Sequence, residues 1–95
     1  MLLEITDVRV RRVFDTGPLK AILSVTLDGV LAIHDVKLVQ AGGRFFAVMP
    51  SKKMRDGSFK DVVHPVENGL RAALEKAAIE AFGKEVAKQA AYLQR

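Results

Sequence analysis

Four basic side chains lie close together near the middle of the chain, and their spacing makes them the strongest candidates for a functional site. They are Lys52, Lys53, Arg55 and Lys60. The ten residues 52–61 that contain them hold only two acids, Asp56 and Asp61, so four positive charges face two negative ones. Lysine and arginine on an exposed loop neutralise phosphates and release counterions, which gives affinity for nucleic acid without sequence choice. The alternative is a solvated basic loop that binds nothing.

The residues around this cluster predict a β-hairpin. A strand-forming apolar run ends at Pro50, and a second run returns through Phe59 to Val63. The turn dipeptide Asp56-Gly57 lies between the two runs, as is typical of a hairpin with a glycine-containing loop. An arm of this kind can enter a groove, where Arg55 can make a bidentate contact to a guanine edge.

Other basic residues are weaker candidates. Arg9 and Arg11 alternate with apolar residues and share one face of a strand, with Arg12 next in the chain. They either extend a nucleic-acid surface or pair with acids on a neighbouring strand, and we favour the pairing. Arg71 and Lys76 are candidate phosphate contacts near the start of a helix, although solvated helix charges are the favoured interpretation.

The histidines and serines do not form a catalytic or metal-binding pattern. The chain has no cysteine, and the pairs His34-Asp35 and Asp61/His64 lack the spacing of a three- or four-ligand site. No serine lies in a nucleophile elbow, whether Ser24, Ser51 or Ser58. We therefore expect a protein that is not an enzyme and that needs no metal or cofactor. We expect His34 at a strand or subunit contact and His64 as a hydrogen-bonding cap of the loop.

Three phenylalanines near the basic cluster have two interpretations. Phe45, Phe46 and Phe59 either stack on single-stranded bases or belong to the core. Aromatic residues within strands more often pack in the core, and Phe59 beside Lys60 is the least certain of the three.

The 95 residues suit one small domain, 1–95, with a sheet over about 3–64 and a helix over about 69–93. Period-2 alternation predicts strands over 3–14 and 19–27, with a bulge near Thr6-Asp7. Asp28-Gly29 predicts a two-residue turn, and 30–39 and 45–49 follow as strands. Apolar residues then recur every three or four positions, with Asn68 as N-cap and Gly83 as an interruption. The fold class is α+β: an antiparallel sheet of four to five strands with a C-terminal helix packed on one face.

Assembly and location follow from composition and pattern. The run 30–39 is apolar on both faces, which predicts that it is covered on two sides and favours a homodimer. A chain this small has a thin core, which dimerisation would help. The net charge of +4 permits a nucleic-acid partner. No apolar run approaches the ~20 residues of a membrane span, and we see no signal-peptide pattern, so we expect a cytoplasmic protein without a membrane partner.

Three ordered strings resemble one known family. They are Phe45 to Pro65, with its Met-Pro-Ser-Lys-Lys segment and final His-Pro; Glu4 to Val13; and Val25 to Asp28 followed by Ile33 to Val36. Together they cover residues 3 to about 75. They resemble the bacterial sporulation stage V protein G family, the septation regulators. Pro18 and the tail beyond Phe82 depart from the family pattern.

The resemblance implies a homodimeric regulator of gene expression that binds DNA, and in some members RNA, with roles in septation, sporulation or stationary-phase control. Carried over by position, the implied contacts are Lys52, Lys53, Arg55, Lys60 and Arg71. Ser51, Gly57 and His64 would hold the hairpin in shape. The alternative function is a protein–protein adaptor, in which the hairpin binds an acidic partner and the apolar stripe of the helix is a docking surface.

Overall fold

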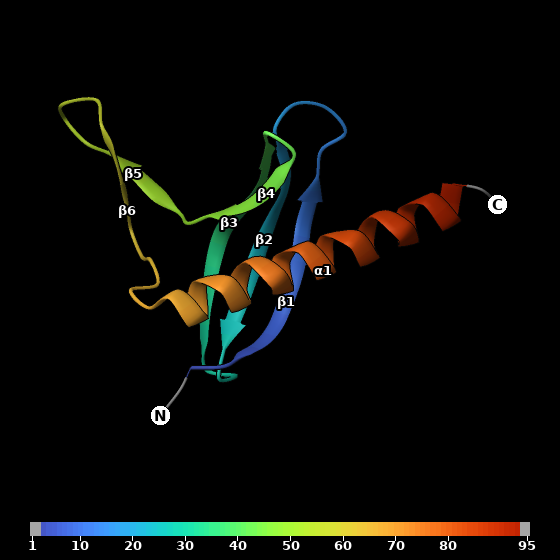
Figure 1. Cartoon of the computed structure of the whole chain (residues 1–95), viewed down its shortest axis with the longest axis horizontal. Helices are drawn as coiled ribbons and strands as arrows, with labels where there is room; N and C mark the ends of the chain where they lie inside the picture. The colour runs from blue at the N-terminus through green and yellow to red at the C-terminus, as the bar shows by residue number, and fades with distance from the viewer. Residues whose placement is uncertain (1–2, 94–95) are drawn as a thin grey trace.

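Four strands form an antiparallel meander that carries the rest of the chain (Figure 1). The computed structural model describes residues 3–93, with side chains over 3–90, so the ends of the predicted domain lie outside the described residues. The strands are β1 (Ile5–Val13), β2 (Leu19–Leu27), β3 (Leu31–Ala41) and β4 (Arg44–Val48), in the spatial order β1-β2-β3-β4. Each pairs with its neighbour in sequence, because short turns join them.

A two-stranded arm and one long helix complete the fold. The arm, β5 (Ser51–Lys53) with β6 (Phe59–Asp61), is a separate small sheet that projects away from the meander (Figure 1). The helix α1 (Asn68–Leu93) packs on one face of the large sheet, so the predicted α+β class is confirmed. It begins at Asn68, but the N-cap is Glu67, one residue earlier than predicted. The Glu67 carboxylate accepts a hydrogen bond from the Gly69 N–H, and the Glu67 carbonyl accepts one from the Arg71 N–H at 3.3 Å.

The helix is longer than the sheet beneath it is wide. Its 26 residues run through Gly83 without interruption, and at ~1.5 Å per residue they span about 39 Å. Three strand spacings of about 4.8 Å separate the outer strands of the meander by ~14 Å. The C-terminal half of α1 therefore extends beyond β1 (Figure 1).

The turns follow the glycine signals. Asp28 and Gly29 both have positive φ (52° and 68°), and Val30 N–H donates to the Leu27 carbonyl at 3.0 Å. This is a type I′ turn with the two predicted central residues, and β3 begins one residue later than predicted. The unexpected Pro18 lies in the β1–β2 loop, where its carbonyl accepts a hydrogen bond from Gln40 N–H at 2.8 Å.

Bulges set which side chains face the helix. The predicted bulge near Thr6 is confirmed by a register shift between Ile5 and Asp7. A further register shift lies between Leu23 and Val25 of β2, where Ser24 faces two residues of β3, His34 and Asp35. Asp35, in this bulge, has a positive φ of 61°.

The bulge in β3 corrects one prediction. It puts Ile33 and Val36 on the same face although they are three residues apart. Within one chain only Val36 and Leu38 of this strand are buried, so the predicted covering of 30–39 on two sides is not seen. The bulge shifts the alternation of β3 by one residue, so apolar side chains before and after it face the same side. In the sequence this shift looks like a strand that is apolar on both faces.

The core lies between the sheet and α1. Its fully buried large side chains come from β2 and β3: Leu23, Val25, Val36 and Leu38. Leu74 and Ala78 of α1 close it from the helix side, and Phe82 packs at its margin. The small Ala78 side chain is fully buried, which lets the helix approach the sheet closely. The other face of the sheet, which carries Ser24, is not covered by α1.

Candidate nucleic-acid interface

The arm is built from two three-residue strands in a fixed register. Lys52 lies opposite Lys60, and Lys53 lies opposite Phe59. Because side chains alternate along a strand, Lys52 and Lys60 share one face and Lys53 and Phe59 share the other. Like charges directly opposite one another are destabilising. An anion bound between Lys52 and Lys60 would relieve that repulsion.

The tip of the arm is closed by a compact hydrogen-bonded turn. Met54 N–H donates to the Ser58 carbonyl at 2.7 Å, and Gly57 N–H donates to the Met54 carbonyl at 3.0 Å. Gly57 has φ 90°, which L-residues with a Cβ rarely adopt, so this position requires glycine as predicted. At the base, Val62 N–H donates to the Pro50 carbonyl at 2.8 Å. The arm is thus pinned at both ends.

Asp56 orders the tip through Ser58. Its carboxylate accepts hydrogen bonds from the Ser58 hydroxyl at 2.6 Å and from the Ser58 N–H at 2.9 Å. These bonds, the hydroxyl first, lower the pKa of Asp56 below its ordinary value. The resemblance implies that Ser51, Gly57 and His64 hold the hairpin in shape. The positive φ of Gly57 fits this role, and the Asp56–Ser58 contact adds a second element that orders the tip.

Four of the five predicted contact residues line one hollow on the arm. It has a volume of about 530 Å³, is open to solvent, and is lined by Lys52, Lys53, Met54, Arg55, Asp56 and Lys60. Four cations and one carboxylate therefore surround a single concavity. The only ion pair within residues 3–90 joins Arg9 to Asp7, so the cations of the arm are unpaired in this part of the chain. Exposed, unpaired cations around a hollow suit a phosphate backbone.

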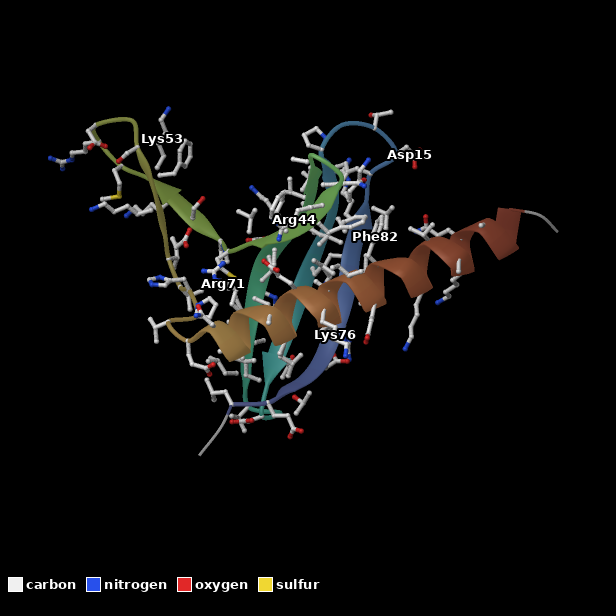
Figure 2. The ribbon with its side chains drawn as sticks, viewed as in Figure 1. Asp15, Arg44, Lys53, Arg71, Lys76 and Phe82 are labelled. Atoms are coloured by element: carbon white, nitrogen blue, oxygen red, sulfur yellow. The ribbon has the colours of Figure 1, made fainter. Side chains whose placement is uncertain are left out.

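Arg71 lies apart from this hollow. Figure 2 shows Lys53 on the arm and Arg71 at the start of α1, near the base of the arm. Arg71 is exposed, but it does not line the hollow. Lys76 is also exposed and borders a groove between β1 and α1 instead.

The arginines of β1 are engaged within the chain. Arg9 Nε pairs with Asp7 of its own strand at 3.0 Å, and the Arg12 guanidinium lies 4.7 Å from the centre of the Phe14 ring. Arg11 Nε donates to the Ser24 hydroxyl at 3.0 Å. The predicted pairing with acids of the neighbouring strand is wrong, because the partners are an acid of the same strand, a hydroxyl and a ring.

Ser24 and His34 form a cross-strand contact. The Ser24 hydroxyl is 2.9 Å from His34 Nδ1, and Arg11 reaches the same oxygen, so one hydroxyl links β1, β2 and β3. Ser24 is only 6% exposed. The predicted strand contact for His34 is confirmed. Within residues 3–90, no three His, Cys, Asp or Glu side chains cluster as metal ligands.

The three phenylalanines divide between core and surface. Phe45 packs against Phe82 with ring centres 6.0 Å apart, at the margin of the core. Phe46 is half-buried, with the Arg44 guanidinium 5.6 Å from its ring centre. Phe59 is 67% exposed on the arm, so the core interpretation is wrong for it. Its neighbours Ser58 and Lys60 are polar, which is the sequence signal that separates it from Phe45.

Comparisons with known proteins place the chain in a family. Residues 3–84 match the family model described as SpoVG. The chain is 44% identical over 80 residues to a "Putative septation protein SpoVG" of Desulforudis audaxviator, covering 84% of this chain and 91% of the relative. It is 45% identical over 89 residues to "Putative septation protein SpoVG 1" of Listeria monocytogenes, covering 94% and 85%.

A third relative extends the match along the helix. A "Putative septation protein SpoVG" of Thermoanaerobacter is 39% identical over 90 residues, which cover 95% of this chain and 98% of the relative. The family model ends at Lys84, just past the point where the sequence departs from the family pattern. Separately, no helix in the described part of the chain is long and apolar enough to cross a membrane. The agreement of the family model with relatives along nearly the whole chain shows that this protein belongs to the SpoVG family.

Proposed function

We propose that this protein is a nucleic-acid-binding regulator of bacterial gene expression, of the septation and sporulation regulator type. Its relatives are named as septation proteins. The observation that carries the proposal is the hollow on the arm, which is lined by Lys52, Lys53, Arg55 and Lys60. Among residues 3–90, none of these four side chains forms an ion pair. The expected ligand is duplex DNA, with RNA as a second ligand.

Binding would be mainly electrostatic. Each arm would neutralise about four phosphates, and two arms in a homodimer would neutralise about eight. At ~0.9 counterions per phosphate, the log–log dependence of affinity on salt has a slope near −7 for the dimer. Arg55 at the tip is the side chain suited to a bidentate contact with a guanine edge, while the lysines fix the arm on the backbone. Arg71 would add a contact at the base of the arm.

The proposal assigns no catalytic step, cofactor or metal to the protein, and it places the protein in the bacterial cytoplasm. The adaptor alternative gains some support from exposed apolar side chains at the base of the arm. Val62 is 68% exposed and Val66 is 92% exposed. In that alternative the arm and these valines contact an acidic protein.

The test is a gel-shift titration on duplex DNA and single-stranded RNA at several salt concentrations. The variant Lys52→Ala/Lys53→Ala/Arg55→Ala removes three charges from the arm. The control Lys37→Ala/Arg44→Ala/Lys76→Ala removes three charges from exposed positions elsewhere. We expect the arm variant to lose binding while the control retains most of it. Equal loss in both would show that only net charge matters, and no binding by the unmodified protein would favour the adaptor.

A further inference from the structure

The outer edge of β4 is an open edge of the large sheet. Among the described strands β4 pairs only with β3, and this pairing runs from Ala41–Arg44 to Lys37–Val48 without a register shift. Within the described part of the chain, no backbone–backbone hydrogen bond outside that ladder involves residues 44–48. The N–H and C=O groups on the outer side of β4 are therefore available to another strand.

The two edges of the sheet differ in how well they are protected against strand pairing. Natural sheets protect an edge with bulges, charged side chains or proline. The strand β1 has two register shifts and carries Asp7 and Arg9, whereas β4 is regular and consists of the apolar run 45–48 after Arg44. Pro50 lies beyond the end of β4 and only limits its length. A short, regular, apolar edge of this kind suits the addition of a strand from a partner.

The side chains of β4 divide between the two faces of the sheet. Phe45 and Ala47 face α1 and belong to the core or its margin. Alternation puts Arg44, Phe46 and Val48 on the face that α1 does not cover. Phe46 is half-buried and Val48 is 39% exposed, with the Arg44 guanidinium 5.6 Å from the centre of the Phe46 ring. The uncovered face thus presents one cation and two apolar side chains in a line along the edge.

The charges in this part of the chain are all of one sign. Residues 36–53 include β4 and the part of β3 that pairs with it, and they contain four bases and no acid: Lys37, Arg44, Lys52 and Lys53. Lys37 lies directly opposite Val48, so a cation lies near each end of β4 on the uncovered face. An acidic segment at this edge meets attraction, and a basic segment meets repulsion.

We propose that β4 accepts an extended, acidic segment of a partner protein as a fifth strand of the large sheet. The segment runs antiparallel to β4, because antiparallel pairs are slightly more stable per residue. It places an acid opposite Arg44 and aromatic or β-branched residues opposite Phe46 and Val48, since such cross-strand pairs stabilise a sheet. Backbone hydrogen bonds supply the affinity and the side-chain pairs the specificity. The inference goes beyond the proposed function and does not depend on nucleic-acid binding.

A protein segment fits this edge better than nucleic acid does. The donors and acceptors of β4 repeat with the ~3.4 Å rise of a strand, and another peptide backbone has matching groups at the same spacing. The side chains beside them on the uncovered face are mostly apolar. The cations suited to a phosphate backbone gather on the arm instead.

Peptide binding tests the proposal. The probe is the fluorescein-labelled peptide Thr-Val-Val-Ile-Val-Glu-Glu, whose first glutamate falls opposite Arg44 when its isoleucine falls opposite Phe46. By fluorescence anisotropy it should bind at least about tenfold more tightly than the same peptide with lysine in place of both glutamates, because attraction becomes repulsion. Replacing its central Val-Ile with Pro-Pro should abolish binding, since proline donates no ladder hydrogen bond. Equal binding of the acidic and basic peptides, binding of the proline peptide, or no binding of the acidic one would each overturn the proposal.

Charge reversal at Arg44 tests where the segment lies. Arg44→Glu should invert the preference, so that the lysine peptide binds more tightly than the glutamate peptide. Lys84→Glu makes the same change at an exposed position of α1 and should leave the preference as it is. Circular dichroism checks that both variants fold. A folded Arg44→Glu variant that still prefers the acidic peptide would place the segment elsewhere on the protein.

Amide hydrogen exchange detects the added strand directly. Saturating acidic peptide should slow the exchange of the outward-facing amides of β4 by about tenfold or more, because they become donors in a new ladder. The amides of β1, on the opposite edge, should keep their rates. Protection of β1 in place of β4 would refute the assignment of the edge.

The arm variant Lys52→Ala/Lys53→Ala/Arg55→Ala separates this inference from the proposed function. It should bind the acidic peptide almost as tightly as the unmodified protein does, and loss of that binding would assign the peptide to the arm. Displacement of the peptide from this variant by single-stranded RNA would make nucleic acid the occupant of the edge. Self-association of the unmodified protein that Arg44→Glu abolishes would make a second copy the occupant. Undiminished nucleic-acid binding by the arm variant would count against the proposed function alone.

Discussion

Lys52 lies directly opposite Lys60 in the two-stranded arm. Two like charges at paired positions oppose the formation of the arm, and that arm has only three residues in each strand. In the described part of the chain no acid forms an ion pair with either lysine. The arm therefore carries an unfavourable interaction that an anionic ligand would convert into a favourable one, which is the physical basis of the proposed phosphate contact.

Replacing Lys60 with alanine should have opposite effects on the free arm and on binding. The repulsion with Lys52 disappears, so the arm should gain about 0.2–1 kcal/mol of local stability, seen as slower amide hydrogen exchange. One phosphate contact per protomer disappears as well, so the salt slope should fall by ~0.9 for each arm. Lys37→Ala, on β3, should change neither quantity. A slope unchanged by Lys60→Ala would remove this residue from the interface.

The Asp56–Ser58 contact predicts how the arm responds to acid. Hydrogen bonds from Ser58 lower the pKa of Asp56 below 3.8 in the folded arm, so the ionised carboxylate stabilises the tip above that pH. This stabilisation is lost as the pH falls through the lowered pKa. Ser58→Ala should move the pKa of Asp56 up towards its ordinary value, measured by NMR titration of the carboxyl carbon. Ser51→Ala, at the other end of the arm, should leave that pKa where it is.

The sequence predicted most of the fold because its signals are local. The alternation of apolar residues in β2 depends only on neighbouring residues, and so do the turn signals Asp28-Gly29 and Gly42-Gly43. The structure forms the strand and both turns at these places. The bulge at His34-Asp35 depends on how β3 aligns with β2, so alternation alone could not reveal it. For that reason β3 was predicted to be covered on two sides. The link from Arg11 through Ser24 to His34 depends on the same register.

The candidate site was predictable for a similar reason. Lys52, Lys53, Arg55 and Lys60 fall in one hairpin, and a hairpin necessarily keeps its members together. The place of Arg71 depends on the path of residues 62–67 between the arm and α1. No local pattern sets that path, so the sequence could not show that Arg71 lies outside the hollow.

Two glycine substitutions should have opposite effects. Gly57 has φ 90°, so Gly57→Ala should cost the tip about 1–2 kcal/mol and weaken nucleic-acid binding.

Gly83 is exposed within α1 and has nothing within 4 Å of an added Cβ. Gly83→Ala should therefore raise the free energy of unfolding by about 0.5–1 kcal/mol, measured by urea denaturation. If Gly57→Ala binds as tightly as the unmodified protein, the shape of the tip does not matter for binding.

Removing the Ser24 hydroxyl should destabilise the sheet. Ser24 is buried, and its oxygen is shared by Arg11 Nε and His34 Nδ1. Ser24→Ala leaves both groups without this partner, at an expected cost of about 1–2 kcal/mol by urea denaturation. Thr26→Ala, two residues along the same face and half-buried, is the matched control and should cost less. DNA binding should be unaffected by either change, since neither side chain lies on the arm.

Phe59 predicts a difference between single-stranded and duplex ligands. The ring is 67% exposed and lies opposite Lys53, so an unpaired base can stack on it while the lysine meets the adjacent phosphate. Stacking on an aromatic side chain contributes about 1–3 kcal/mol per base, and bases within a duplex are not available for it. Phe59→Ala should therefore weaken binding to single-stranded RNA at least about fivefold more than binding to duplex DNA, by fluorescence anisotropy at one salt concentration. Phe46→Ala, on the large sheet, separates this effect from a general loss of aromatic surface. Equal weakening of both ligands by Phe59→Ala would mean that the ring supports the shape of the arm and does not contact bases.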